Sequence, residues 1–205
     1  MKYIIGITGG SGAGKSSVSN ILRENGIEIT DGDKVARLIM EPGEKCLLET
    51  VSVFGKEILD DNGRLIRKKL ANIVFSHKEK LLLLNKITHK YITEYFKKII
   101  TKSEDCFLGI DGAALFESGI NNMCDIVIGV ISDEDIRIKR IMNRDMISYD
   151  EAKRRIDLQK KDEFYIENCD VLVYNNGNIE ELREQVEEVL KRLRHEKEEK
   201  EITSL

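Results

Sequence analysis

Cysteines are few in this sequence, and they lie far apart. No two of them form a C-x-x-C pair, so neither a zinc site nor a redox dithiol of that kind is indicated. We expect all four to be reduced thiols, which is typical of cytosolic proteins. These cysteines are Cys46, Cys106, Cys124 and Cys169.

Long hydrophobic runs and an excess of basic residues are also missing. No stretch reaches the roughly 18 apolar residues of a membrane-spanning helix, so no membrane partner is expected. The apolar run in MKYIIGITGG is too short for a signal peptide, and we therefore expect a cytoplasmic protein. A net charge of −4 argues against a sequence-independent nucleic-acid binder. The sequence gives no indication of oligomeric state.

Five short apolar, β-branched runs are present instead, separated by segments with helical periodicity. Near-continuous apolar strands that alternate with helices indicate a parallel sheet covered on both faces. We therefore predict an α/β fold, a three-layer α/β/α arrangement around a five-stranded parallel sheet within a single domain, 1–205. The predicted strands are residues 3–8, 27–30, 106–111, 125–131 and 170–174.

The interval between the second and third predicted strands is longer than a crossover connection requires. It has mostly helical periodicity, with a turn at DDNGR, residues 60–64. We predict an inserted helical lobe over about residues 34–104, whose default role in such a fold is to hold a second substrate. A further arginine-rich region, about residues 137–165, is predicted to act as a lid.

Two capping boxes are predicted in that region, one from Ser132 with Asp135 and another from Ser148 with Glu151. After the first box, Arg137, Arg140 and Arg144 recur at helical spacing. Such a basic face is more often solvated than functional, and both interpretations stay open at this point.

The segment TGGSGAGKSS, residues 8–17, fits the phosphate-loop pattern G-x-x-x-x-G-K-[ST] between a predicted strand and a predicted helix. Glycines let backbone N–H groups approach a phosphate, and the helix N-terminus favours the anion. Lys15 would reach the β- and γ-phosphates, and the Ser16 hydroxyl would bind Mg²⁺. The sequence therefore predicts a site for a nucleoside triphosphate, ATP, with Mg²⁺.

Other motifs narrow the class of nucleotide-binding protein. GTPases need N-K-x-D, whereas the nearest segment here, NKIT, has Thr88 in place of the aspartate. An LSGGQ-like signature of ABC-type ATPases is absent from the sequence. A small phosphate-loop domain with an inserted lobe and a distal arginine-rich helix best fits a small-molecule kinase.

Carboxylates follow two of the predicted strands. In TDGDKVAR, residues 30–37, Asp31 and Asp33 would face the same side of an extended segment. Asp33 could accept a proton from an acceptor hydroxyl or hold Mg²⁺, or it could simply cap the next helix. Asp111, at the end of the third strand, could organise Mg²⁺ or be an ordinary turn residue.

Taken in order, several motifs make the chain resemble the dephospho-CoA kinase family over nearly its whole length. The series is more specific than the phosphate loop alone. It consists of ITGGSGAGKSS, TDGDKVAR with EPG (41–43), FG (54–55), GRLIRKKL (63–70), LNKITH (84–89), LFESG (115–119), the Arg140/Arg144 helix, RRIDLQ (154–159) and CDVLVYNNG (169–177).

The resemblance implies transfer of the ATP γ-phosphoryl group to the 3′-hydroxyl of dephospho-CoA, which gives CoA and ADP in the last step of coenzyme A biosynthesis. It implies that Asp33 is the general base and that Arg140 stabilises the transferring phosphoryl group. Arg144 is the alternative for that role, or a contact of the adenine or the lid. The ATP cradle would comprise Gly12, Ala13, Gly14, Lys15, Ser16 and Ser17, with Asn175 and Asn176 near the adenine.

On the acceptor side, the resemblance implies that Arg37, His89 and Glu117, together with Asp33, bind dephospho-CoA. From the residues alone, His89 could equally be a partly buried helix residue and Glu117 a helix cap. Two other functions stay open: another small-molecule phosphate-loop kinase, acting on a nucleoside or nucleotide, and, from a different class, a regulatory protein that binds nucleotide as a switch.

This chain departs from the usual family pattern around the acceptor lobe. The family usually has His-Pro where this chain has His89 and Lys90. It usually has Pro-Leu-Leu before Phe-Glu, where this chain reads DGAALFE with Ala113 and Ala114. D-G-D stands where D-A-D is common, and Pro42 is the only proline. Because proline fixes φ and restricts the preceding residue, we expect altered backbone stiffness and an effect on acceptor affinity.

Overall fold

The computed structural model describes residues 2–75, 77–103 and 105–203. The chain forms two compact units, and each is considered by itself. The core unit comprises Met1–Thr30, Glu104–Leu115 and Met123–Leu205. The helical unit comprises Asp31–Ser103 and Phe116–Asn122.

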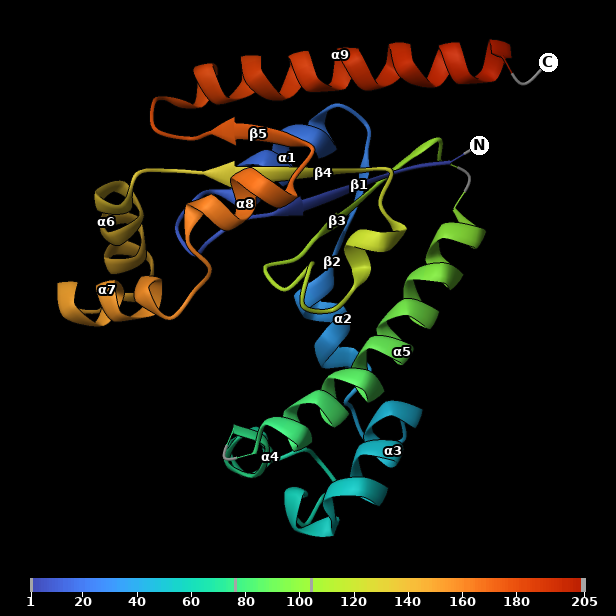
Figure 1. Cartoon of the computed structure of the whole chain (residues 1–205), viewed down its shortest axis with the longest axis vertical. Helices are drawn as coiled ribbons and strands as arrows, with labels where there is room; N and C mark the ends of the chain where they lie inside the picture. The colour runs from blue at the N-terminus through green and yellow to red at the C-terminus, as the bar shows by residue number, and fades with distance from the viewer. Residues whose placement is uncertain (1, 76, 104, 204–205) are drawn as a thin grey trace. The chain divides into compact units, whose positions relative to one another are not determined.

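A five-stranded sheet forms the centre of the core unit, with strand order β2-β3-β1-β4-β5 (Figure 1). The β1–β3, β1–β4 and β4–β5 pairs are parallel. Every residue of β1 is buried, as a central strand covered on both faces requires. The predicted α/β class is confirmed, and each strand lies within one residue of its prediction. The strands are β1 (Tyr3–Thr8), β2 (Glu28–Asp31), β3 (Phe107–Asp111), β4 (Ile126–Ile131) and β5 (Val171–Tyr174).

Helices cover both faces of the sheet. On one face, alternate strand residues such as Ile5 and Ile128 share a core with α1 (Lys15–Glu24) and the first half of α9 (Ile179–Thr203). On the other face, α8 (Asp162–Asn168) packs against β4. Figure 1 shows α9 as the long red helix beside β5.

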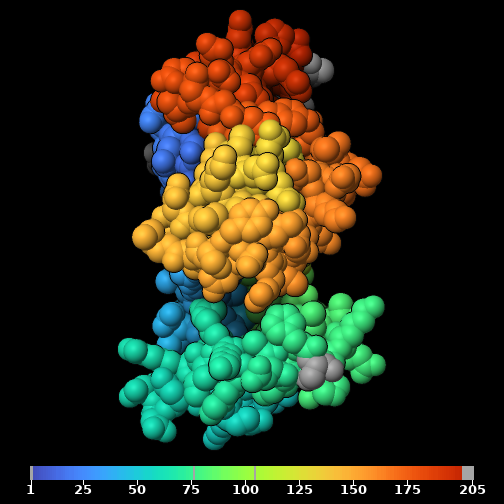
Figure 2. Space-filling view, turned by 90° about the vertical axis from the view of Figure 1, so that its left-hand side faces the viewer, coloured from blue at the N-terminus to red at the C-terminus, as the bar shows by residue number. Residues whose placement is uncertain are grey.

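Helices α6 (Glu134–Asp145) and α7 (Tyr149–Asp157) pack against each other and extend the core unit. Their apolar contact is a small cluster of Ile138 and Ile141 with Ala152 and Ile156. In Figure 2 their yellow and orange atoms form one continuous exposed surface.

One of the two predicted capping boxes is present. Ser148 caps α7, and Glu151 bonds back to it, so this prediction is confirmed. The Ser132–Asp135 box is wrong, because α6 begins at Glu134 after Asp133. Ser132 is instead fully buried at the end of β4, where its hydroxyl donates to the Asn175 carbonyl oxygen across the sheet edge.

The helical unit is built around one long helix, α5, which contacts α2, α3 and α4. Its core contains buried apolar residues from three of these helices, including Phe54, Leu70 and Phe96. In the predicted turn at 60–64, the Asp60 carboxylate accepts from the backbone N–H groups of Asn62 and Arg64. The elements are α2 (Gly32–Leu38), α3 (Lys45–Phe54), η1 (Lys56–Ile58), α4 (Arg67–Phe75), α5 (Lys78–Lys102) and η2 (Ile120–Met123).

Helix α5 runs without a break through His89 and Lys90, where the family pattern has His-Pro. A proline inside a helix removes a backbone hydrogen bond and clashes with the preceding turn, whereas Lys90 continues the helix. The Lys90 ammonium lies 2.9 Å from the Glu49 carboxylate of α3, and the Tyr91 hydroxyl donates to the same carboxylate at 2.6 Å. At the other departure, Ala113 and Ala114 lie exposed in the turn after β3.

Among the described residues, no helix combines the length and the apolar character that crossing a membrane requires.

Candidate active site

The phosphate loop follows the central strand, β1, at the carboxyl edge of the sheet. The carboxyl ends of the parallel strands line one crevice at this edge. Gly9, the first residue after β1, passes against β4. A Cβ on Gly9 would lie 2.4 Å from the Val130 carbonyl oxygen, and its φ is 148°. Only glycine allows this close approach, so the loop's direction over β4 depends on this residue.

Lys15 begins α1 and extends back across the loop. Its Nζ lies 2.8 Å from the Gly9 carbonyl oxygen. Gly14, the residue before the helix, has a φ of 105° in the left-handed region. The structure therefore combines a glycine-rich loop, a helix N-terminus and a lysine ammonium, which is the arrangement that binds phosphate. In the same loop Ser16 is exposed and Ser17 is half-buried.

Arg140 and Asn175 lie against the backbone of the phosphate loop. The Arg140 Nη1 donates to the carbonyl oxygens of Gly12 at 3.3 Å and Ala13 at 3.4 Å. The buried Asn175 donates from Nδ2 to the Ala13 carbonyl at 2.8 Å, and its Oδ1 accepts from Arg140 Nη2 at 3.2 Å. The structure thus brings two of the predicted site residues, from α6 and from the end of β5, to the loop.

Asn176 lies beside the start of α6. Its Nδ2 donates to the Asp133 carboxylate, and its Oδ1 accepts from the Asp133 backbone N–H, both at 2.8 Å. This pair of bonds joins the end of β5 to the residue that precedes α6.

Arg144 is exposed, and its hydrogen bonds go to Asp145 rather than to the loop. The guanidinium donates to both Asp145 oxygens, at 2.8 and 2.9 Å, and Arg155 from α7 binds the same carboxylate. The Arg144 guanidinium, with a smaller contribution from Arg155, lowers the pKa of Asp145 to about 2. The structure therefore places Arg144 in an ion cluster that joins α6 to α7.

Replacing Arg144 with glutamine is expected to raise the pKa of Asp145 from about 2 toward its ordinary value of 3.8. A depressed carboxyl pKa means that the cluster stabilises the fold above the ordinary pKa and that this contribution is lost as the pH falls through about 2. A carboxyl-carbon NMR titration measures this pKa. Arg192→Gln, on α9, is the matched control and should leave it unchanged. An Asp145 pKa that stayed near 2 without Arg144 would contradict the assignment.

Asp111 faces the phosphate-loop helix at the end of β3. Its Oδ2 accepts a hydrogen bond of 2.7 Å from Ser19, a fully buried residue of α1. Strand β3 neighbours β1 in the sheet, so this carboxylate follows the strand adjacent to the loop. This bond joins the end of β3 to α1 at the edge of the sheet where the phosphate loop lies.

Two residues near the loop were not identified as site residues from the sequence. Arg137 is only 3% exposed, so the interpretation of a solvated arginine face is wrong for this residue. It donates from Nε to the Ser11 carbonyl at 3.0 Å and pairs with Asp162. Burial raises the pKa of Asp162, and the Arg137 charge opposes that rise.

Gln159 is the second of these residues, and it also binds Ser11. Two sequence signals could have indicated the pair. Gln159 ends the motif RRIDLQ, and Arg137 lies at helical spacing from Arg140.

In the helical unit, the first turn of α2 corrects two expectations about TDGDKVAR. Strand β2 ends at Asp31 and α2 begins at Gly32, so Asp31 and Asp33 do not share an extended segment. Asp31 is the N-cap and accepts a hydrogen bond of 2.9 Å from the Lys34 backbone N–H. The interpretation of Asp33 as the cap is therefore wrong, and its side chain is exposed in the first turn.

The predicted acceptor residues come from three segments of the helical unit. Arg37 is exposed in the last turn of α2, His89 is half-buried in α5, and Glu117 is exposed in the segment after β3. Burial lowers the pKa of His89, which favours a neutral imidazole. Over the described residues, no hydrogen bond or ion pair joins the side chains of these three and Asp33, so the structure does not bring them together by direct contact.

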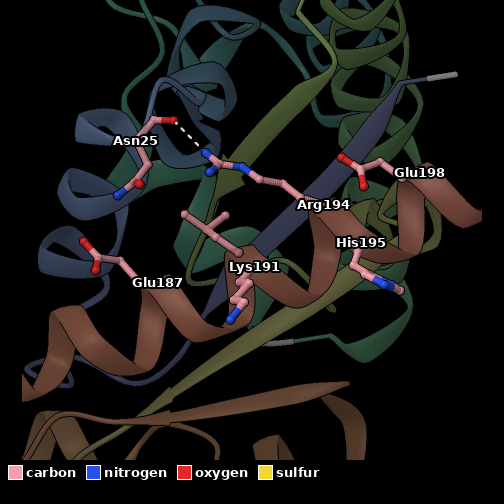
Figure 3. Close-up of a pocket in the computed structure, with 7 residues that line it drawn as sticks. Asn25, Glu187, Lys191, Arg194, His195 and Glu198 are labelled. Carbon is pink, nitrogen blue, oxygen red and sulfur yellow. Dashed lines mark hydrogen bonds between the residues drawn. The ribbon is translucent and has the colours of Figure 1, made fainter.

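A hollow of about 430 Å³ occurs at the other end of α1 (Figure 3). It lies between Asn25 and one side of α9, and Arg194 donates to the Asn25 carbonyl there at 3.3 Å. Since α1 has ten residues, roughly 15 Å of helix separates this hollow from the phosphate loop. None of the predicted site residues lines it.

Comparison with known proteins identifies the family of this chain. The family model described as "Dephospho-CoA kinase" matches residues 3–181. A dephospho-CoA kinase of Fusobacterium nucleatum subsp. nucleatum is 43% identical over 184 residues, which cover 90% of this chain and 95% of that protein. The crystal structure of TT1252 from Thermus thermophilus is 29% identical, with a TM-score of 0.80, and covers 94% of this chain and 98% of that chain. The structure of dephospho-CoA kinase from Campylobacter jejuni has 28% identity, a TM-score of 0.65 and the same two coverages. The chain therefore belongs to the dephospho-CoA kinase family.

Proposed function

We propose that the protein transfers the γ-phosphoryl group of ATP to the 3′-hydroxyl of dephospho-CoA, giving CoA and ADP. The observation that carries this proposal is membership of the family over residues 3–181, which includes both the phosphate loop and the helical unit. The reaction would be the last step of coenzyme A biosynthesis, and we propose the cytoplasm as its location.

Residues 12–17 would hold the ATP phosphates, through backbone N–H groups of the loop and the ammonium of Lys15. Two donors at the site fit Mg²⁺: the exposed Ser16 hydroxyl and the Asp111 carboxylate. Mg²⁺ favours oxygen ligands and is usually held by one or two protein groups together with substrate phosphates and water. The bound ion would neutralise charge on the β- and γ-phosphates.

Asp33 would act as the general base. Its carboxylate would accept the proton of the ribose 3′-hydroxyl while that oxygen forms a bond to the γ-phosphorus. The bond from the γ-phosphorus to the oxygen that bridges it to the β-phosphate breaks, and ADP leaves. The exposure of Asp33 in the first turn of α2, with Asp31 as the cap, supports this role because Asp33 is not needed to begin the helix.

Arg140 would stabilise the charge on the transferring phosphoryl group from its place against the loop. Asn175, which bonds to the Ala13 carbonyl, and Asn176 would lie near the adenine. Arg144 would approach the nucleotide from α6 as part of a lid over about residues 137–165. That role requires the Arg144 guanidinium to break its hydrogen bonds to Asp145 and to bind ATP instead.

Dephospho-CoA would bind to the helical unit, about residues 34–104, through Arg37, His89 and Glu117. Glu117 belongs to the segment Phe116–Asn122, which the fold groups with the same unit as α2 and α5. The Lys90–Glu49 ion pair and the Tyr91–Glu49 hydrogen bond join α5 to α3, and we propose that they keep this unit rigid without the family's proline.

An ADP-release assay with several acceptors tests the proposal. Dephospho-CoA is expected to give ATP-dependent, Mg²⁺-dependent turnover, while adenosine and nucleoside monophosphates give little. Turnover on a nucleoside or nucleotide without turnover on dephospho-CoA would favour the other kinase class. Nucleotide binding without turnover on any acceptor would favour a regulatory switch.

A further inference from the structure

Ser11, in the middle of the phosphate loop, is held by a side chain that comes 148 residues later in the chain. Gln159, between α7 and α8, accepts from the Ser11 backbone N–H at 2.8 Å with its Oε1. Its Nε2 donates to the Ser11 hydroxyl at 2.6 Å. One amide group therefore binds both the backbone and the side chain of the same loop residue, which fixes the rotation of that residue.

Arg137 holds the other side of the same residue. Its Nε donates to the Ser11 carbonyl at 3.0 Å, and its Nη1 pairs with Asp162 of α8 at 3.1 Å. Its Nη2 lies 3.4 Å from the Gln159 Oε1, so the arginine also orients the glutamine. Because Arg137 is almost fully buried, these bonds replace its hydration and are costly to lose.

The shape of the loop is fitted to this arginine. A Cβ on Gly10 would lie 2.2 Å from Arg137 Nη2, and a Cβ on Gly12 would lie 2.7 Å from the Arg137 carbonyl oxygen. Glycine is therefore needed at both positions while Arg137 keeps its place. The minimal phosphate-loop pattern does not require glycine at positions 10 and 12. Here Gly10 and Gly12 make room for Arg137 beneath the loop as well as for a phosphate.

In the phosphate loop, the direction of each backbone carbonyl also sets the direction of the N–H group in the same peptide. A trans peptide is planar, and its N–H points opposite to the carbonyl with which it shares the plane. The Ser11 carbonyl points to Arg137, and the carbonyls of Gly12 and Ala13 point to Arg140. The N–H groups of Gly12 and Gly14 therefore point away from the two arginines, whereas the Ala13 N–H donates to the Gly10 carbonyl oxygen at 3.2 Å within the loop.

We propose that Gln159 and Arg137 are positioning residues of the phosphate loop, which fix the Ser11 peptide so that the N–H groups of Gly12 and Gly14 face the ATP phosphates. The proposal rests on the proposed use of ATP, and it assigns no contact between these two side chains and the nucleotide. It also couples the predicted lid region, which contains Gln159, to the loop.

A double-mutant cycle on Ser11 and Gln159 tests this proposal by calorimetric titration with MgATP. Gln159→Leu removes both bonds to Ser11 and keeps a similar volume, and it is expected to weaken MgATP binding about tenfold. Ser11→Ala removes only the hydroxyl and should weaken binding by about threefold. If the two residues act through their mutual contact, Ser11→Ala should have almost no further effect in the Gln159→Leu protein.

Two further measurements separate positioning from a loss of fold. Ser148→Ala removes the N-cap of α7 without touching the loop, and it should lower the melting temperature while leaving MgATP affinity unchanged. In the Gln159→Leu protein at saturating ATP, the KM for dephospho-CoA should stay at the wild-type value, because the acceptor residues belong to the helical unit.

Additive effects of the two substitutions, or an unchanged MgATP affinity in Gln159→Leu, would overturn the inference while leaving the proposed function standing. An equal loss of affinity in Ser148→Ala would also overturn it, because general destabilisation of α7 would then suffice. A wild-type protein that binds no MgATP would overturn the proposed function, and the inference would fall with it.

Discussion

Lys15→Ala is expected to lower kcat/KM for ATP by at least about 10²-fold, the usual cost of removing one charge-stabilising donor from a phosphoryl- or acyl-transfer site. The Lys15 ammonium lies 2.8 Å from the Gly9 carbonyl oxygen, so its side chain spans the concave side of the loop and begins at the helix N-terminus. Removal of this charge should weaken MgATP binding as well as slow transfer, since the β- and γ-phosphates carry charge in both states.

Steady-state kinetics and MgATP titration of the Lys15→Ala protein measure this effect, with the melting temperature as a check on folding. Lys191→Ala is the matched control, because Lys191 is an exposed lysine of α9, outside both the phosphate loop and the predicted lid. Near-wild-type turnover of Lys15→Ala, with a fold that melts normally, would mean that the loop does not bind the transferred phosphate.

The strands and the phosphate loop were predictable because their signals are local. Each strand is a short β-branched run, and a buried parallel strand needs no information beyond its own apolar residues. The loop is similarly local: residues 8–17 are contiguous, and their glycines, lysine and serines carry the chemistry wherever the rest of the chain lies. Helices of the inserted unit were predictable from periodicity for the same reason.

The residues that hold the loop could not be predicted, because each acts across a long sequence separation. Arg137 and Gln159 contact Ser11 from 126 and 148 residues away. In the sequence, Arg137 has the same spacing pattern as a solvated helix face, and only its packing beneath the loop distinguishes it. Ser132 had the pattern of a capping box, but the neighbouring end of β5 offered its hydroxyl a buried carbonyl partner instead.

The prediction for the two aspartates of TDGDKVAR was also wrong, because their spacing alone does not show where the strand ends. Their spacing of two predicted a shared face only if the strand continued, and the strand ends at Asp31. Asp31 and Asp33 have the same chemistry and nearly the same place in the sequence, so local pattern could not decide which of them caps α2. The cap geometry separates them, because Asp31 has extended backbone angles and accepts from the Lys34 N–H.

That separation makes the general-base assignment testable with a control two residues away. Asp33→Asn is expected to lower kcat by about 10² to 10⁴-fold, the usual contribution of a positioned base, because an amide does not accept the hydroxyl proton. MgATP affinity should change little, since the proposed phosphate ligands belong to the loop. Single-turnover measurements of phosphoryl transfer, together with MgATP titration, separate the two effects.

Asp31→Asn removes the same charge from the same segment, but asparagine is as good an N-cap as aspartate, so α2 should keep its start and turnover should stay near the wild-type rate. Comparison of the two variants therefore distinguishes the loss of a proton acceptor from the loss of a nearby negative charge. Equal losses in both variants would assign the effect to charge alone. If Asp33→Asn turned over at the wild-type rate, the base would have to be sought elsewhere, and Asp111, whose carboxylate lies at the end of β3, would be the next residue to replace.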